Sequence, residues 1–241
     1  MRSARAFLLC VTLYQAKAWN QLGADVGQSG VFSVSLSSDG TRLAIGEPGY
    51  ATNAGRVYVY EYSSSATAWA QLGAYVGEYA DDRFGFSVSL SSDGTRMAIG
   101  APGYGPNAGR VRVYEYSSSA WAQLGGDLVG EAADLRFGLS VSLSSNGTRV
   151  AIGAPGLDGQ STGRVQMYKY SSSGWSQLGG DIFGEAADEE FGGSVSLSSD
   201  ATRLAIGAPG YASNAGRVQV YGNLYAYGAD IPVVWACASH R

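Results

Sequence analysis

Charged residues, cysteine and histidine are all scarce in this chain of 241 residues. Charged side chains make up 15 % of the sequence and the net charge is −4, so no basic surface of the kind that binds nucleic acid is expected. Two cysteines, Cys10 and Cys237, cannot build a disulfide framework. The only histidine is His240, which leaves no Ser–His–Asp arrangement and no Cys/His metal cluster.

Glycine and aromatic residues are plentiful instead. The chain has 35 glycines, and 12 % of its residues are Phe, Trp or Tyr. This composition is typical of many short strands joined by tight turns rather than of helices or disorder. A chain of this length can bury a sizeable core, and we expect one cooperative body.

One stretch recurs along the chain. Its clearest copy is Phe84–Tyr116, and near-identical copies are Val31–Tyr62, Phe137–Tyr170 and Phe191–Tyr221. A second phrase, W-x-QLG, separates them and begins at residues spaced by 50, 52 and 54 positions: Trp19, Trp69, Trp121 and Trp175. A fixed period of this size predicts a repeat architecture.

Each unit contains four strand candidates. In the first, Phe86, Val88 and Leu90 alternate with serines, the period of a strand. An Asp-Gly or Asn-Gly turn follows in three units, and Asp200-Ala201 replaces it in the fourth, where we expect slight strain or another turn type. The second strand ends at a Gly-Ala-Pro phrase, the third reads GRVRVYEY, and the fourth is built around the Trp phrase.

We interpret the small and large residues of these strands as a gradient. On one face it would run from Ser through Ala or Gly to Tyr and then Trp, which suits sheets that nearly touch at an axis and diverge outward. The predicted fold is therefore all-β, a β-propeller of four-stranded antiparallel blades with about four blades visible. A stacked solenoid also has a period, but without this gradient. The phrase Trp19–Asp25 could complete the last blade and close the ring.

The predicted organisation has three parts. Residues 1–18 have the basic start, short apolar run and small-x-small site of a signal peptide, and the run is too short to span a bilayer. The competing interpretation is the degraded end of an upstream repeat. Residues 19–221 hold the repeats, with units near 19–68, 69–120, 121–174 and 175–221. The tail 222–241 does not match them, although Ile231–Trp235 could form an alternative last strand.

The repeat resembles the FG-GAP repeat, the blade unit of integrin alpha-subunit propellers and related extracellular proteins. The last three units carry both halves, as in Phe84-Gly85 followed by Gly100-Ala101-Pro102. The first unit departs, with Gly30-Val31 for Phe-Gly, a shorter preceding loop and Glu47 for the Ala. The resemblance implies a propeller with a binding or adhesion role that is secreted or at the cell surface.

Two departures limit what the resemblance implies. Integrin-type propellers usually have seven blades, so four units indicate a truncated chain, a small propeller or a half-ring that pairs with a copy of itself as a homo-oligomer. The calcium loops of the family carry several acids, whereas the corresponding turn here has a single carboxylate next to an arginine. Calcium needs six to eight oxygen ligands. We therefore expect no metal in this turn and no cofactor.

Two sets of loop residues are candidate ligand-binding positions. Acidic loops precede the inner strands and could form a ring that binds cations or a basic ligand, or be an ordinary solvated rim: Glu78, Asp82, Glu131, Asp134, Glu185 and Asp188. Three tyrosines follow the Gly-Ala-Pro phrase and could recognise sugars or proteins, or simply cover the loop: Tyr50, Tyr104 and Tyr211, with Leu157 breaking the set.

The leading interpretation is an extracellular module that presents propeller loops to a protein or carbohydrate ligand. A propeller-fold hydrolase or lyase with carboxylates near the axis, or a purely structural surface repeat, are the alternatives. No catalytic residues stand out, so the sequence favours a protein that is not an enzyme. Asn146-Gly147-Thr148 is a glycosylation sequon, which matters only if the chain is secreted.

Overall fold

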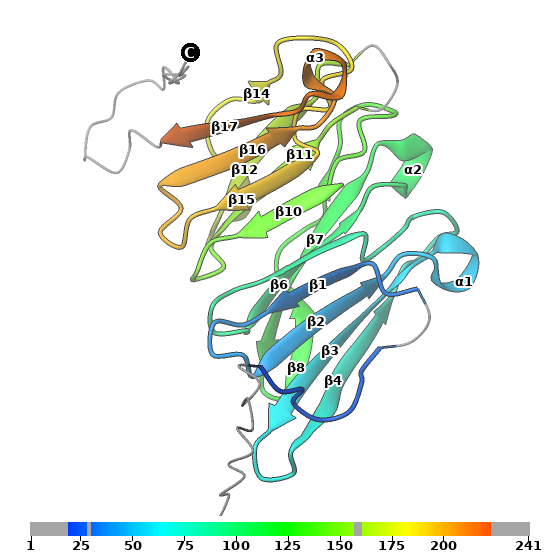
Figure 1. Ribbon diagram of the computed structural model, residues 1–241, viewed down its shortest axis with the longest axis vertical. Coiled ribbons are helices and arrows are strands. Elements are labelled where there is room, and N and C mark those ends of the chain that lie inside the picture. The colour runs from blue at the N-terminus through cyan, green and yellow to red at the C-terminus, as the bar shows by residue number, and fades with distance from the viewer. Residues whose placement is uncertain (1–18, 28–29, 157–160, 223–241) are drawn as a thin grey trace, which may run out of the picture.

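Four antiparallel sheets follow one another along the computed structural model, which describes residues 19–27, 30–156 and 161–222 (Figure 1). The sheets lie side by side as the blades of a β-propeller, which confirms the predicted fold class. The expected signal peptide, Leu157, and all of the tail except Gly222 lie outside the described residues.

The first two blades show the design. The first blade consists of β1 (Ser33–Leu36), β2 (Arg42–Glu47), β3 (Arg56–Ser63) and β4 (Ala68–Val76). The second consists of β5 (Ser87–Leu90), β6 (Arg96–Ala101), β7 (Arg110–Ser117), β8 (Ala120–Gln123) and β9 (Leu128–Val129). Its outer strand is divided, and both pieces pair with β7, whereas β4 stays continuous through an irregularity opposite Val59 and Tyr60.

The other two blades repeat this order. The third consists of β10 (Ser140–Leu143), β11 (Arg149–Ala154), β12 (Arg164–Ser171), β13 (Gly174–Gln177) and β14 (Ile182–Phe183). The fourth consists of β15 (Ser194–Leu197), β16 (Arg203–Ala208) and β17 (Arg217–Gly222). Within the described residues β17 pairs only with β16, so its outer edge has no partner strand.

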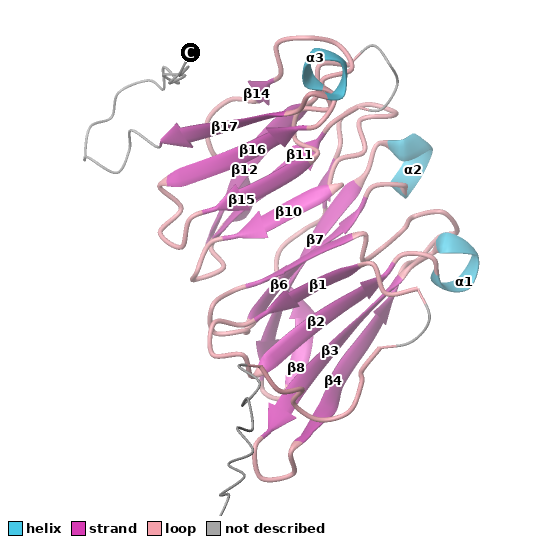
Figure 2. Ribbon diagram, in the orientation of Figure 1, coloured by secondary structure: helices cyan, strands magenta, loops and turns pink. Residues whose placement is uncertain are grey.

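Short helical turns lie at one end of the blades, between the second and third strands (Figure 2). They are α1 (Tyr50–Asn53), α2 (Tyr104–Asn107) and α3 (Tyr211–Asn214), and each contains residues with positive φ angles. The hairpin turns that join the first strand to the second lie at the opposite end. The blades therefore have two distinct loop faces.

The hairpin turns are closed by a carboxylate. Asp39 accepts hydrogen bonds from the Ser37 hydroxyl (2.6 Å), the Thr41 amide (3.0 Å) and the Thr41 hydroxyl (2.9 Å). The bond from Ser37, with those from Thr41, lowers the pKa of Asp39 to about 2. In the fourth copy Ala201 adopts φ +55°, close to the +71° of Gly40, so the turn keeps the same backbone form. The expected strain is present because a residue with a Cβ atom adopts a positive φ at this position.

The strand register corrects the predicted size gradient. Met97 pairs with Tyr114 and Ala98 with Val113, so the tyrosines share a face with the large aliphatic residues. The small face runs from Ser through Ala and Gly to Val instead. The prediction that the tyrosines lie on the small face is wrong because both patterns alternate with period two, and alternation alone does not fix the register between strands.

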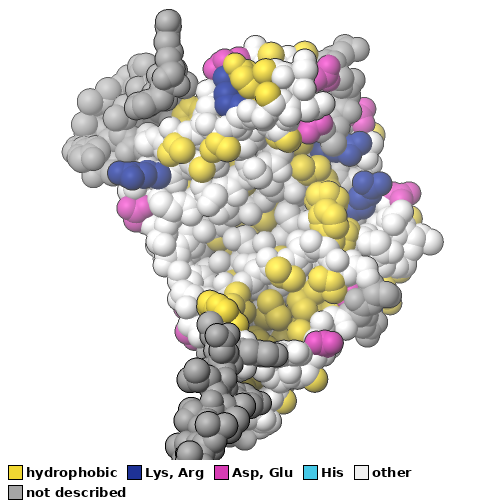
Figure 3. Space-filling model, in the orientation of Figure 1, with side chains coloured by type: hydrophobic (Ala, Val, Ile, Leu, Met, Phe, Trp, Pro, Cys, Tyr) yellow, Lys and Arg dark blue, Asp and Glu magenta, His cyan; other side chains and the backbone are white. Residues whose placement is uncertain are grey.

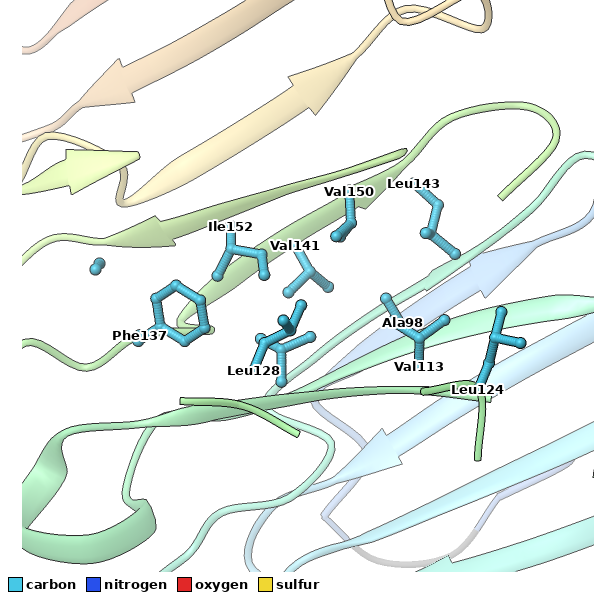
Figure 4. Close-up of a cluster of buried hydrophobic side chains, with 11 residues drawn as sticks. Ala98, Val113, Leu124, Leu128, Phe137, Val141, Leu143, Val150 and Ile152 are labelled. Atoms are coloured by element: carbon cyan, nitrogen blue, oxygen red, sulfur yellow. The ribbon is translucent and has the colours of Figure 1, made fainter. Parts of the chain in front are cut away.

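Each large face packs against the small face of the preceding blade. Between the second and third blades, Val111 and Val113 meet Val141, Leu143 and Ile152 (Figure 4). Equivalent clusters fill the other two boundaries. Because all these side chains are nearly excluded from solvent, the hydrophobic core is divided among the blade boundaries rather than concentrated at one centre.

The serines of the inner strands join the blades by hydrogen bonds. The Ser87 hydroxyl donates to the Gly138 carbonyl of the next blade (2.8 Å), and the Ser89 hydroxyl accepts from the Leu143 amide (3.0 Å). The hairpin turns are linked in the same sense, since the Ser92 amide donates to the Ser145 carbonyl (2.8 Å). Serine recurs here because a small hydroxyl reaches the neighbouring backbone where the blades are close.

The ring suggested by the sequence is open in the structure. The first and last blades lie at opposite ends of an arc in Figure 1. The segment 19–27 contacts the first blade rather than β17: the Trp69 indole donates to the Leu22 carbonyl (2.9 Å). This is the position of an outer strand of a preceding blade, since Trp175 donates in the same way to Leu124 (2.7 Å). The expectation that this segment completes the last blade within the same chain is wrong.

Candidate functional site

A buried arginine opens the third strand of the second blade, on the face that carries α2. Arg110 and Asp82 are each 2 % exposed and form an ion pair at 3.2 Å. Arg110 also contacts Glu78 (3.2 Å) and Asp127 (3.3 Å), and its guanidinium lies 4.0 Å from the centre of the Tyr104 ring. Burial raises the pKa of Asp82, and the Arg110 guanidinium acts in the opposite direction because it stabilises the ionised carboxylate.

The same arrangement recurs with different acids. Arg217 pairs with Glu185 (2.8 Å) and with buried Glu189, and it stacks on Tyr211. Arg164 pairs with Asp181 (2.9 Å) and Glu131 (3.4 Å), and Leu135 occupies the place of Asp82 and Glu189. Each blade therefore holds its arginine with a locally available carboxylate.

The first blade explains the departure at Glu47. Its preceding loop is shorter, so no residue corresponds to Asp82. Glu47 supplies the carboxylate from β2 and pairs with Arg56 at 2.6 Å, and Tyr50 lies 3.8 Å from the guanidinium. The Ala→Glu change in the sequence is thus a local replacement for the missing loop acid.

These contacts place the predicted tyrosines and acids. Tyr50, Tyr104 and Tyr211 cover the arginines, as the cation–π distances show. Four of the predicted acids lie in ion pairs rather than in an open ring: Glu78, Asp82, Glu131 and Glu185.

The other two predicted acids differ. The Asp134 carboxylate accepts a hydrogen bond from the side-chain amide of Asn107 (3.0 Å), and the Asp188 side chain is exposed to solvent. Four acids that pair with these arginines are not among the predicted site residues: Glu47, Asp127, Asp181 and Glu189. Aligning the three acidic loops position by position would have paired Asp82 with Glu189.

Arg83 and Arg136 differ from these paired arginines. Neither forms an ion pair with any described residue. The backbone of each is held in place, since the Arg83 backbone N–H donates to the Asn53 carbonyl and the Arg136 backbone N–H to the Asn107 carbonyl, both at 2.8 Å. Arg83 is exposed and has φ +56°. The Arg83 guanidinium is therefore available to a ligand, whereas Arg136 is half-buried.

The two arginines line neighbouring depressions on the same loop face, which we call the Arg83 groove. Its first part is a shallow pocket of about 210 Å³ lined by Phe32, Pro48, Gly49, Asn53, Arg83 and Phe86. A second depression shares Arg83 and Phe86 and reaches Pro102, Gly103, Asn107, Arg136 and Leu139, but it holds only about 10 Å³. The rings of Phe32 and Phe86 lie 4.6 Å apart across the blade boundary. The groove combines positive charge, amide groups and flat apolar walls.

The described residues contain no group of three or more His, Cys, Asp or Glu side chains that could hold a metal ion. A search of the same residues for a helix long and apolar enough to cross a bilayer found none. The sequon residue Asn146 is exposed, and its side-chain oxygen accepts hydrogen bonds from the Ser144 hydroxyl (2.9 Å) and the Thr148 amide (3.0 Å).

Comparison with known proteins supports the fold. No protein-family model and no curated protein matches this sequence. A candidate 6-phosphogluconolactonase from Bacteroides uniformis is similar in structure, with a TM-score of 0.57 and 14 % identity over 90 % of this chain and 57 % of that chain. Hydrazine synthase from Kuenenia stuttgartiensis has a TM-score of 0.55 and 16 % identity over 81 % of this chain and 53 % of that chain.

Both similar proteins contain β-propellers. At these identities the likeness concerns the fold alone. The chain spans slightly more than half the length of each of these structures.

Proposed function

We propose that this chain is a binding module whose Arg83 groove recognises a carbohydrate bearing carboxylate or sulfate groups. The observation that carries the proposal is that Arg83 and Arg136 lack acidic partners among the described residues, while the arginines that open the third strands are paired. An unpaired guanidinium at the surface is a ready partner for an anionic group, which it can bind through two parallel hydrogen bonds.

The apolar walls favour a sugar ring as the carrier of the charge. Phe32 is 61 % exposed and lies against Phe86, so a flat face next to Arg83 is open to solvent. Aromatic faces pack well against the apolar faces of sugars. The side-chain amide of Asn53 donates one hydrogen bond to Asp81 (3.0 Å), and its remaining donor and acceptor capacity can serve a hydroxyl. The shallow shape of the groove suits a chain lying across the surface more than a small molecule enclosed in a pocket.

The alternative of a hydrolase rests on weaker ground. The similar structure from Bacteroides uniformis is described as a 6-phosphogluconolactonase, which is consistent with a hydrolytic activity on this fold. However, four of the six acids expected near the axis are engaged with arginines. A carboxylate held in an ion pair is a poor general acid, because the arginine stabilises its ionised form.

An extracellular location belongs to the same proposal. It is supported by the signal-like pattern of residues 1–18 and by the resemblance to FG-GAP repeats, which also point to a binding role.

The test is a binding titration with an oligogalacturonate and with a sulfated oligosaccharide, followed by calorimetry. We expect Arg83→Gln to weaken binding roughly 10- to 100-fold, which corresponds to about 1.5–3 kcal/mol for a hydrogen bond to a charged group. Lys169→Gln is the matched control, since Lys169 is an exposed cation on β12 outside the groove. Equal affinities for both variants, or no binding of either acidic oligosaccharide, would contradict the proposal, and release of product would favour the hydrolase.

A further inference from the structure

The small face of the fourth blade is bare although it keeps the residues of a blade boundary. Val218 and Val220 are 70 % and 58 % exposed. The corresponding residues of the second blade, Val111 and Val113, are at most 1 % exposed because the third blade covers them. The face therefore has the chemistry of a core surface in a place where the described chain offers no cover.

Gly207 points to what belongs on this face. A Cβ added to the equivalent Gly100 would overlap the carbonyl oxygen of Gly138, which belongs to the next blade. A Cβ at Gly46 or Gly153 would likewise overlap a carbonyl oxygen of the next blade, that of Gly85 or Gly192. At Gly207 a Cβ meets only its own blade's Ser194. The backbone at this position is shaped for the close approach of another blade of the same kind.

The opposite end of the arc carries the complementary face. Val34 and Leu36 on β1 are 64 % and 54 % exposed, whereas the corresponding Val141 and Leu143 on β10 are 9 % and 7 % exposed. Figure 3 shows hydrophobic side chains gathered over β1 and β2 on the open side of the arc. The first blade thus presents an uncovered large face.

The two ends also complement each other in their strands. β17 lacks an outer partner strand among the described residues, and the segment 19–27, which is not itself a strand, lies beside the first blade in the position of an outer strand. By the register of the other blades, in which Tyr168 pairs with Gln177, Tyr221 would pair with Gln21. A blade docked on β1 would therefore receive this segment as its fourth strand.

We infer that two copies of this chain associate head to tail, the fourth blade of each docking on the first blade of the other to close one ring. The docked face would repeat the internal boundary: the Ser194 hydroxyl would donate to the Val31 carbonyl, as Ser87 does to Gly138. The Leu36 amide would donate to the Ser196 hydroxyl, as Leu143 does to Ser89.

Two copies are the expected number because the arc aligns with little more than half of each similar structure. A head-to-tail contact makes a closed ring only when the rotation per copy divides a full turn.

The test is the solution mass of the full-length chain, measured by light scattering during gel filtration at about 10–100 μM, the range in which a modest interface is populated. We expect twice the chain mass of 25.1 kDa. Val218→Glu and Val34→Glu should each reduce the mass to that of one chain while leaving the circular dichroism unchanged, because both side chains are exposed in a single copy. Val129→Glu is the control, since Val129 lies on the outer strand of the second blade and is 43 % exposed.

A mixture of the two variants tests the head-to-tail arrangement. The Val34→Glu chain keeps an intact fourth blade, and the Val218→Glu chain keeps an intact first blade. In the mixture the fourth blade of the Val34→Glu chain can dock on the first blade of the Val218→Glu chain, so pairs joined by one intact boundary should form. Absence of such pairs would overturn the arrangement. A wild-type chain of single mass would overturn the proposal itself. If deletion of residues 223–241 then produced the double mass, the tail would be identified as the occupant of the open face instead.

Discussion

The buried pair of Arg110 and Asp82 allows a sharp test of what its two members contribute. Among the described residues, Arg110 is the only cation that forms an ion pair with Asp82, and both side chains are 2 % exposed; Arg110→Met removes that cation. A carboxylate left buried without its partner costs about 3–5 kcal/mol. For a domain of this size that corresponds to a fall in Tm of roughly 6–20 °C.

Asp82→Leu should have a much smaller effect. Arg110 keeps Glu78 and Asp127, and the third blade already has Leu135 at the equivalent position. Because burial raises the pKa of Asp82, its ionised form is costly, and replacing it by an apolar side chain of similar volume should cost at most about 1 kcal/mol.

The double variant decides between coupling and independence. In Arg110→Met/Asp82→Leu no unpaired carboxylate remains buried at this place, since Glu78 is 44 % exposed and Asp127 keeps Arg112 at 2.9 Å. We expect it to be more stable than Arg110→Met alone by about 2 kcal/mol or more, as contacting residues often show such coupling. Urea unfolding followed by tryptophan fluorescence measures the three values. Equal losses in the single variants that add up in the double variant would refute the argument.

Three further predictions concern the turns and the blade boundaries. Ala201→Gly should raise stability by about 0.5–1 kcal/mol in urea unfolding, because Gly accepts the positive φ at this position, and a loss of stability would show that the buried methyl group outweighs the strain. The pKa of Asp39 is lowered to about 2 in the folded protein, so the unfolded chain binds the proton more readily. The stability of the fold should therefore decrease as the pH drops from about 4 to 2. Asp39→Asn should make this decrease smaller, as measured by thermal melts at several pH values. Gly100→Ala should destabilise the fold by about 1–3 kcal/mol because the added methyl overlaps the next blade, whereas Gly207→Ala should change the folding stability of a single copy far less but weaken pairing in gel filtration.

The fold could be predicted from the sequence because the same pattern recurs in register. A single copy of Phe84–Tyr116 would be compatible with several all-β folds, but near-identical copies at a nearly constant period leave few architectures. The face on which Tyr114 lies could not be read in this way. It depends on the pairing of β6 with β7, and a shift of one residue exchanges the two faces.

The candidate site was less accessible to sequence reasoning. Acids in loops look alike in a sequence whether they face solvent or an arginine, so Asp82 was indistinguishable from Asp188. Arg83 and Arg136 do not belong to the two arginine positions that recur in all four units, so the repeat pattern alone does not single them out. Glu190 replaces them in the fourth unit, and this difference between copies was the available signal. The openness of the arc depends on tertiary contacts of residues 19–27 that no local pattern encodes.

The serine contacts between blades have a consequence for the gene as well as for the protein. Each blade offers on its small face the groups that it receives on its large face, so a boundary does not depend on which particular unit follows. An in-frame loss or duplication of one whole unit, 50 to 54 residues in length by the tryptophan spacing, would leave every remaining boundary with matching partners. The products of such a change would keep the serine contacts that join neighbouring blades. Blade number is therefore a trait that evolution can change in single steps, and related chains with more or fewer units are to be expected.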